Sequence, residues 1–440
     1  MTRFLLFTVL AAAQWTLQTA HALDSRADVD KVIELIEAGQ LSLARTYLEP
    51  ALIDPRLSPP ERSRAYYLRG YSYFVQGMHT SAANDYGHAL EFNPENPAVL
   101  AAMGSMYFNG FGRKRDYVAA YGLFEQAAAL GHPGALMQMG HANLMGLGVE
   151  RDLVKAREYL TQAADLGSAP AMFQLASSYR TEFTDQPEPT LAQSWFEKAH
   201  EAGSTDALVA LGYMYQNGEL GEADQSKAIE FYKQAAEAGS GPGQVSLGHA
   251  CLVGAGVEQD YALAQTWLLK AAEQGVPSSY LYLGHMYLSG EGAPIDVDAA
   301  RGWFERGAKA NSFEAQIRLA YLLLKDPSTH AQAREWLARA VAHDHPRAHN
   351  DYAWMLATSK HDELRDGALA LEHALAAVDG EPSAGHLDTL AAAYAELAQF
   401  EQAISVQLQA LDLIKTEQPE LLEELHKHLV AYQQSQPWRE

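Results

Sequence analysis

The chain of 440 residues carries 55 acidic and 32 basic side chains, which gives a formal net charge of −23. Nucleic acids and anionic membrane surfaces are bound through clustered lysine and arginine, so this balance argues against both as partners. Cys251 is the one cysteine in the sequence, which excludes an internal disulfide. Side-chain packing therefore has to hold the fold together.

The first residues have the pattern of a secretory signal peptide. Arg3 precedes an apolar run over residues 4–13, and residues 20–22 (AHA) form a small–x–small cleavage site. The apolar run is far shorter than the roughly 20 residues that span a bilayer, and no later segment is long enough. We expect cleavage between Ala22 and Leu23 and a periplasmic protein with no membrane span. A retained signal anchor is the alternative.

Helix–turn–helix patterns follow directly. Residues 23–60 predict two capping helices, because the ends of a repeat array face water and lose the regular pattern. Residues 61–96 then predict a helix pair in which small residues allow close helix approach and aromatic residues fill the gap. Its skeleton is Tyr66, Gly70, Tyr73, Ala82, Tyr86, Ala89 and Pro94. This spacing resembles the tetratricopeptide (TPR) repeat, from which Arg69 departs, since that family usually carries leucine there.

A second repeat with a period of 36 residues fills the segment 97–345. Seven copies start near Pro97, Pro133, Ala169, Thr205, Gly241, Pro277 and Phe313. A fixed period of this length is typical of a solenoid. The copies share a set of recurring positions, called the frame here. These are a glycine in the first helix, a Gly-x-Gly turn, an acidic residue before the second helix and a glycine at the end of the copy. It resembles the Sel-like repeat (SLR), a relative of the TPR.

Each position of the frame has a structural explanation. The turn glycines allow the left-handed backbone that ends a helix, and the acidic residues suit the N-terminus of the second helix as a cap or by the helix dipole. These acidic residues are Asp116, Asp152, Glu188, Asp224, Asp260 and Asp296. Bulky anchors of the second helix are predicted at Tyr159, Trp195, Phe231, Trp267, Trp303 and Trp336.

The C-terminal part returns to TPR-like pairs. Residues 346–416 predict two of them, and residues 417–440 predict a capping helix followed by a frayed tail, SQPWRE. In all, the sequence predicts 23 helices and no strand. The resemblance to SLR and TPR proteins implies an all-α fold, an α/α right-handed superhelical solenoid of helix–turn–helix repeats.

No catalytic pattern stands out against this architecture. The Gly-x-Gly turns follow helices and precede an acidic residue, so they are not phosphate loops. Cys251 occupies a slot that is tyrosine in other copies, which favours a buried, unreactive thiol. His343, His345 and His349 form the densest histidine run, yet His345-Pro346 matches His132-Pro133 and belongs to the repeat pattern. We expect no enzyme activity, no cofactor and no metal.

The candidate binding residues lie one position after the frame glycine of each first helix. Resemblance to TPR arrays implies that this position faces the concave groove, where such proteins hold peptides or partner helices. With Phe108 beside them, the candidates are Tyr71, His141, Tyr213, His249, His285, Tyr321 and Trp354. Aromatic and imidazole groups combine contact area with a hydrogen bond at low entropic cost. The alternative is that they only pack between adjacent first helices.

Two functions follow from this reading. The first is a non-catalytic protein–protein interaction scaffold in the bacterial envelope, which binds a partner protein or peptide along the concave face. The second is a polysaccharide- or peptidoglycan-binding envelope protein, because Tyr213, Tyr321 and Trp354 could stack on sugar rings. A hydrolase is the weakest reading, since no titratable groups converge in the sequence pattern.

Overall fold

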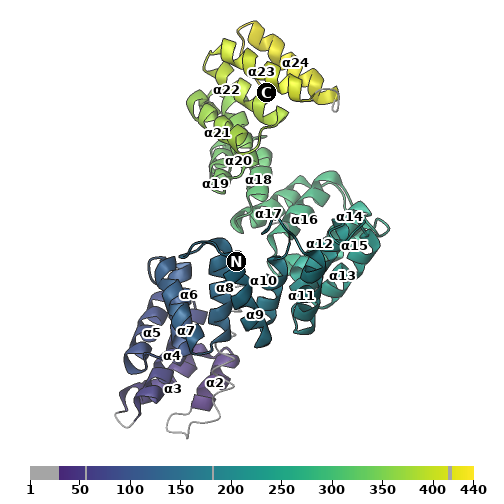
Figure 1. Cartoon of the computed structure of the whole chain (residues 1–440). Coiled ribbons are helices and arrows are strands. Elements are labelled where there is room, and N and C mark those ends of the chain that lie inside the picture. Colours follow the sequence, from purple (N-terminus) through teal and green to yellow (C-terminus); the bar gives the residue numbers. More distant parts are fainter. Residues whose placement is uncertain (1–28, 55–56, 181–182, 415–418) are drawn as a thin grey trace. The chain divides into compact units, whose positions relative to one another are not determined.

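A computed structural model describes residues 29–54, 57–180, 183–414 and 419–440, and these contain 23 α-helices, two short 3-10 helices and no strand (Figure 1). The number of α-helices equals the number predicted. The predicted signal peptide, 1–22, lies outside the described residues. Among the described helices, none is long and apolar enough to cross a membrane.

The helices fall into two compact units, one up to Ala228 and one from Ile229. The helices of the first unit are α2 (Val29–Glu37), α3 (Leu41–Ile53), α4 (Pro59–Val75), α5 (His79–Phe92), α6 (Pro97–Asn109), α7 (Tyr117–Ala129), α8 (Pro133–Met145), α9 (Leu153–Asp165), α10 (Ala169–Ser177), α11 (Pro189–Glu201) and α12 (Thr205–Gln216). Helix α13 (Gln225–Glu237) contains the division between the units.

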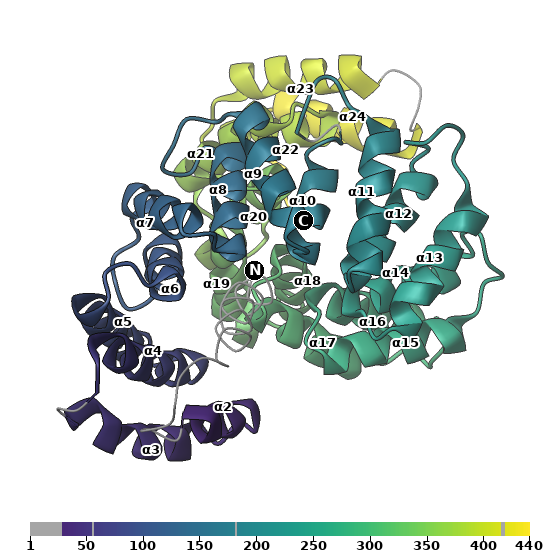
Figure 2. The same cartoon turned by 60° about the horizontal axis from the view of Figure 1, so that its bottom comes forward.

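The second unit continues the same alternation of first and second helices. Its helices are α14 (Gly241–Val253), α15 (Tyr261–Glu273), α16 (Pro277–Ser289), α17 (Val297–Lys309), α18 (Phe313–Leu323), η2 (Pro327–Thr329), α19 (His330–Val341), α20 (Pro346–Thr358), η3 (Asp362–Leu364), α21 (Gly367–Gly380), α22 (Ala384–Glu396), α23 (Phe400–Ile414) and α24 (Pro419–Gln433). Within each unit, successive pairs stack side by side (Figure 2).

The glycine turns end the first helices as predicted. Gly110, Gly146, Gly254 and Gly290 are C-caps in the left-handed region, with φ between 70° and 78°. Copies six and seven close with Asn311 (φ 64°) and Asp344 (φ 52°) where other copies have glycine. These side chains tolerate left-handed geometry better than most, so the turn persists without glycine.

The acidic residues cap the second helices through hydrogen bonds. The carboxylates of Asp116, Asp152, Asp224, Asp260 and Asp296 each accept from the backbone N–H three residues later, at 2.9–3.0 Å. Glu188 occupies the same place before α11 but makes no such bond. A histidine caps first helices in the same way: Nδ1 of His132 accepts from Ala135 N at 3.2 Å, and Nδ1 of His345 accepts from Arg347 N at 3.2 Å.

The predicted bulky anchors are shifted by one residue. Trp195, Trp267, Trp303 and Trp336 are only partly buried, and each lies under a Lys or Arg three residues later at 4.0–4.8 Å. The fully buried residue is the next one along the helix, namely Phe196, Leu268, Phe304 and Leu337. Where the first helix has the frame glycine, this residue packs against it: a Cβ on Gly284 would lie 2.4 Å from Cε1 of Phe304.

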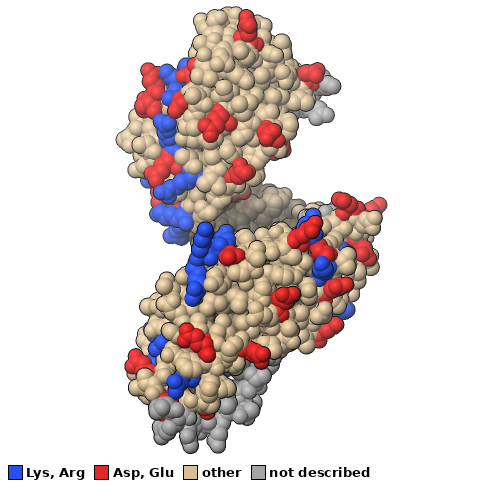
Figure 3. All heavy atoms as spheres, turned by 60° about the vertical axis from the view of Figure 1, so that its left-hand side comes forward, with Lys and Arg blue, Asp and Glu red and all other residues tan. Residues whose placement is uncertain are grey.

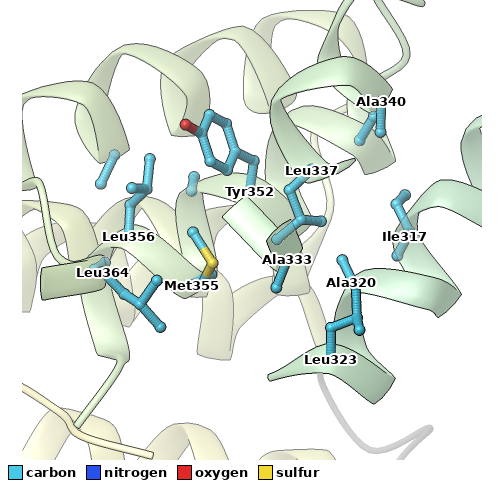
Figure 4. Packing of buried hydrophobic residues seen from close by; sticks show 14 of the residues in the cluster. Ile317, Ala320, Leu323, Ala333, Leu337, Ala340, Tyr352, Met355, Leu356 and Leu364 are labelled. Atoms are coloured by element: carbon cyan, nitrogen blue, oxygen red, sulfur yellow. The ribbon is translucent and has the colours of Figure 1, made fainter. Parts of the chain in front are cut away.

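The core of the second unit is built from these contacts. In Figure 4, Ile317, Ala320 and Leu323 of α18 meet Ala333 and Leu337 of α19 in the same interior as Tyr352, Met355 and Leu356 of α20. Leu364 of η3 belongs to this cluster at 2% exposure. Burial of such side chains contributes about 1.5–3 kcal/mol each. The short η3 turn is therefore anchored in the core.

Arg69, the departure from the TPR pattern, has a partner in the second helix of its pair. Its guanidinium donates to both carboxylate oxygens of Asp85 at 2.7 Å. This hydrogen bonding to Asp85 is the main reason that the pKa of Arg69 is raised. Asp85 is buried, so its charge depends on Arg69 for compensation.

Candidate functional site

The first-helix series, defined as Tyr71, His141, Tyr213, His249, His285, Tyr321 and Trp354, differs in exposure from copy to copy. Tyr213 is 43% exposed, whereas Tyr71 is 7% exposed and belongs to the core. The other five are partly buried, as is Phe108. Burial raises the pKa of Tyr71. Gln138 of α8 and Gln174 of α10 are buried as well.

Several members touch the neighbouring first helix. The ring centroids of Phe108 and His141 lie 6.0 Å apart, and those of His249 and Tyr282 lie 4.9 Å apart. Tyr321 of α18 donates a hydrogen bond of 3.2 Å to Asp351 of α20. The series therefore joins consecutive repeats, and its members other than Tyr71 are not fully buried.

The three histidines of the series are neutral at neutral pH. Burial lowers the pKa of His141, His249 and His285, and Arg318 and Arg347 lower that of His285 further. A neutral imidazole offers one hydrogen-bond donor and one acceptor. His285 also packs edge-on against Phe304, with centroids 5.5 Å apart.

The prediction of a frayed tail is wrong, because the last residues dock against α20. The backbone N–H of Glu440 donates to Thr358 O at 2.9 Å, and Lys360 N donates to Glu440 O at 3.3 Å. The indole Nε1 of Trp354 donates to the Glu440 carboxylate at 3.0 Å. An extended segment of the chain thus binds where the first-helix series ends.

Arg439 strengthens this docking from the other side of the segment. It donates to Ala357 O at 3.0 Å and forms an ion pair with Glu396 of α22. Arg365 binds the same Glu396 carboxylate at 3.0 Å. Charge-assisted hydrogen bonds of this kind are roughly twice as strong as neutral ones. Both main-chain and side-chain groups therefore hold the segment.

Charged groups act on Tyr321 and Asp351 near this end of the series. The pKa of Tyr321 is raised, first by burial and then by Asp351 and Glu440, so Glu440 lies within electrostatic reach of two members of the series. Burial also raises the pKa of Asp351, while Arg347 and Arg318 oppose that rise. Arg318 acts in the same direction on Tyr321, whose pKa it lowers against the effect of burial.

A buried polar cluster under the tail was missed by the sequence reading. The Asp388 carboxylate pairs with Nδ1 of His428 at 2.8 Å and accepts from Gln407 at 2.7 Å. His428 lies between Trp354 and Trp438, with centroids at 5.7 and 4.4 Å. The signal available in the sequence was polar residues on apolar helix faces, which normally need a partner.

The histidine run does not converge on one point. His345 stacks on Phe313 at 4.4 Å, whereas Nδ1 of His349 meets Nδ1 of His373 at 3.1 Å. Cys251 is fully buried as predicted, and burial raises its thiol pKa above the usual value. A buried protonated thiol is a poor nucleophile.

Charge on the visible face is mixed. In Figure 3, the Lys and Arg side chains in the upper part of the view alternate with Asp and Glu. Flat aromatic rings, neutral imidazoles and a few arginines suit the binding of an extended segment better than bond-making chemistry.

The family model of the Sel1 repeat matches seven consecutive segments: 97–132, 133–168, 169–204, 205–240, 241–276, 277–312 and 313–345. The chain belongs to the Sel1 repeat family. The seven Sel1 repeats begin at the seven residues that the sequence pattern predicts. Sel1 and TPR-like repeats generally mediate protein–protein interaction and generally act as non-catalytic scaffolds.

Several solved structures are similar to this chain. The chain is similar to a Sel1 repeat protein from Oxalobacter formigenes, with 24% identity over 53% of this chain and 95% of that chain and a TM-score of 0.45. It is also similar to c5321, a protective antigen of uropathogenic Escherichia coli with an SLR fold, with 23% identity over 85% and 90% of the two chains and a TM-score of 0.40. The APC/C hetero-tetramer Cut9-Hcn1 has a TM-score of 0.50 at 14% identity over 91% and 77%.

A search of curated proteins gave no match.

Proposed function

We propose that this Sel1 repeat protein is a non-catalytic scaffold of the bacterial envelope that binds an extended segment of a partner protein along the first-helix series. The observation that carries the proposal is the docking of Arg439 and Glu440 on α20. The first-helix side here accepts an extended chain through two main-chain hydrogen bonds to one residue and an indole hydrogen bond to its side chain. A partner segment can use the same groups.

The chemistry of this end of the series indicates what the partner carries. Trp354 donates a hydrogen bond to the acidic side chain of Glu440, and Glu440 also acts electrostatically on Tyr321. We infer that the partner presents an acidic residue in an extended segment. Farther along, His285 and His249 are partly buried neutral rings that add contact area and hydrogen bonding. Such amphipathic rings give recognition at low entropic cost.

Site-specific crosslinking tests the proposal. A photoreactive amino acid at position 285 is compared with one at Arg301, an exposed residue on the second helix α17. We expect a crosslinked partner from position 285 and none from position 301. The partner should be lost when Tyr213, His249 and His285 are all changed to Ala. Equal crosslinking from both positions, or full recovery with the triple variant, would contradict the proposal.

The envelope location rests on the signal-peptide pattern of residues 1–22 and needs its own test. A reporter enzyme that is active only in the periplasm is fused after Ser25. We expect activity, and a fusion that stays in the cytoplasm would overturn the location without affecting peptide binding. The two parts of the proposal therefore fail separately.

A further inference from the structure

Two short turns that break the repeat pattern meet in the second unit. Residues 325–330 (KDPSTH) replace the glycine turn of copy seven, and there η2 leads into His330, the first residue of α19. In the next pair, His361 directly precedes η3, which contains Glu363.

The side chains of these turns converge on one point. Nδ1 of His330 lies 3.1 Å from Oε1 of Glu363, and Nδ1 of His361 lies 3.8 Å from the same oxygen. One nitrogen or oxygen from each of the three residues lies within 4.8 Å of the other two. Ligands of a tetrahedral zinc ion are about 3.3–3.5 Å apart, given metal–ligand bonds of about 2.0–2.2 Å. Small rotations of two exposed side chains close the difference.

The other ring nitrogen of His330 already has a partner. Its Nε2 lies 3.2 Å from the carbonyl oxygen of Leu324, an acceptor, so Nε2 carries a proton. A neutral His330 therefore presents an Nδ1 lone pair toward a carboxylate oxygen, and two lone pairs repel unless a positive charge lies between them. A second proton or a metal cation can supply that charge. A histidine N–H held by a backbone carbonyl is the usual support of a metal-binding imidazole.

The corresponding junction in the first unit shows which contacts of this cluster belong to the packing of the repeats. His79, the first residue of α5, stacks on Phe111 of the next turn at 4.4 Å, as His330 contacts the His361 ring at 4.3 Å. Ring contact at this junction is therefore common to both places. Phe111 has no ligand atom, whereas His361 and Glu363 add two. The additional donors are not needed for packing.

Buried residues also hold the two turns in place. Leu364, next to Glu363, is 2% exposed in the core, and His330 is 3% exposed. His361 and Glu363 keep their side chains 46% and 61% exposed, which leaves a path for an ion from solvent. One ligand is thus rigid and buried, and two are accessible.

We propose that Nδ1 of His330, Nδ1 of His361 and a carboxylate oxygen of Glu363 bind a divalent transition-metal ion of the zinc class, with water in the remaining position. Two imidazoles and one carboxylate suit zinc and its neighbours better than Mg²⁺ or Ca²⁺. The ion would tie copy seven to the helix pair that follows it. This site departs from the expectation of no metal and is independent of the proposed peptide binding.

Electrostatics agree with an ionised carboxylate at this place. A backbone hydrogen bond and then the contact with His330 lower the pKa of Glu363, so its charge is present at neutral pH. A carboxylate ligand has to be deprotonated and both imidazoles have to be neutral, so metal binding should weaken at acidic pH.

Metal titration of the whole chain, with any affinity tag removed and after chelator treatment, tests the site. We expect one Co²⁺ per chain with visible d–d absorption bands, displacement by Zn²⁺, and a Zn²⁺-dependent rise in Tm. His361→Ala and Glu363→Gln should each weaken binding at least tenfold and abolish the rise in Tm. Both residues are exposed, so these variants leave the core intact.

His88→Ala is the matched control, because His88 and Glu91 form an exposed pair at 3.2 Å without a third ligand. We expect it to bind Co²⁺ like the unchanged chain. If the unchanged chain shows no Co²⁺ bands, or if His361→Ala binds as tightly, the proposal is wrong. His330 and Glu363 then form only an imidazolium–carboxylate ion pair.

Discussion

Trp354 and Glu440 are joined by a hydrogen bond of 3.0 Å across 86 positions of the chain. Trp354 is the last member of the first-helix series, so the final residues of the chain occupy the end of the surface assigned to partner binding. A partner segment either displaces Arg439 and Glu440 from α20 or binds beside them. Release of the docked residues can therefore be used to probe the proposed binding surface.

Removing the indole donor should release the segment. We expect Trp354→Phe to increase hydrogen exchange at the amides of Lys360 and Glu440, because both lie in the bonds that the docked segment makes. One hydrogen bond to a charged group contributes about 1.5–3 kcal/mol, which corresponds to at least a tenfold loss of protection. Trp336→Phe, on the second helix α19, is the control. Unchanged exchange in Trp354→Phe would show that the indole does not hold the segment.

Acid should destabilise the first unit through His132. Its ring is 1% exposed and accepts a helix N–H, and burial lowers its pKa to about 4. The unfolded chain, with an ordinary histidine pKa near 6.5, binds more protons between about pH 6.5 and 4. The free energy of unfolding therefore falls as pH falls through this window, by roughly 3 kcal/mol in total.

His132→Ser should flatten this pH dependence, and urea unfolding between pH 7 and 4 measures it. Serine caps the equivalent helices at Ser168, Ser240 and Ser312, so the capping bond can be kept. His345→Ser replaces an exposed cap and should keep the original slope. An unchanged slope in His132→Ser would contradict the assignment.

The Arg69–Asp85 pair should behave as a coupled unit. Asp85→Ala leaves Arg69 without its buried partner and should cost about 2–4 kcal/mol of unfolding free energy. Arg69→Leu together with Asp85→Ala restores the apolar residue usual in TPR repeats and should recover most of that loss. Denaturant unfolding of the single and double variants measures the coupling. A double variant less stable than Asp85→Ala would argue against this view.

Two glycines of the same repeat should respond in opposite directions to alanine. Gly284→Ala places a Cβ 2.4 Å from Phe304 and should cost about 1–3 kcal/mol. A Cβ on Gly302, in the middle of α17, meets nothing within 4 Å, so Gly302→Ala should stabilise by about 0.5–1 kcal/mol. Thermal unfolding compares the two. Equal effects would mean that the close helix approach at Gly284 is not rigid.

Much of the fold could be predicted because the repeat is held by short-range contacts. The period, the left-handed glycine turns and the Asp116-type caps depend on residues within a few positions of one another. The anchor was misplaced by one residue because Trp303 and Phe304 are both large and apolar. Only the distance from the Gly284 backbone shows that Phe304 fills the gap between the helices.

The sequence by itself determined the repeats, their helix boundaries and the positions of the first-helix series, since neighbouring copies repeat the same local interactions. Tertiary structure alone decided which distant groups meet: Glu440 with Trp354, His428 with Asp388 across 40 positions, and Glu363 with His330 across 33. These contacts occur once and carry no period. They arise where the array ends or its turns change length, so only the stacked helices bring them together.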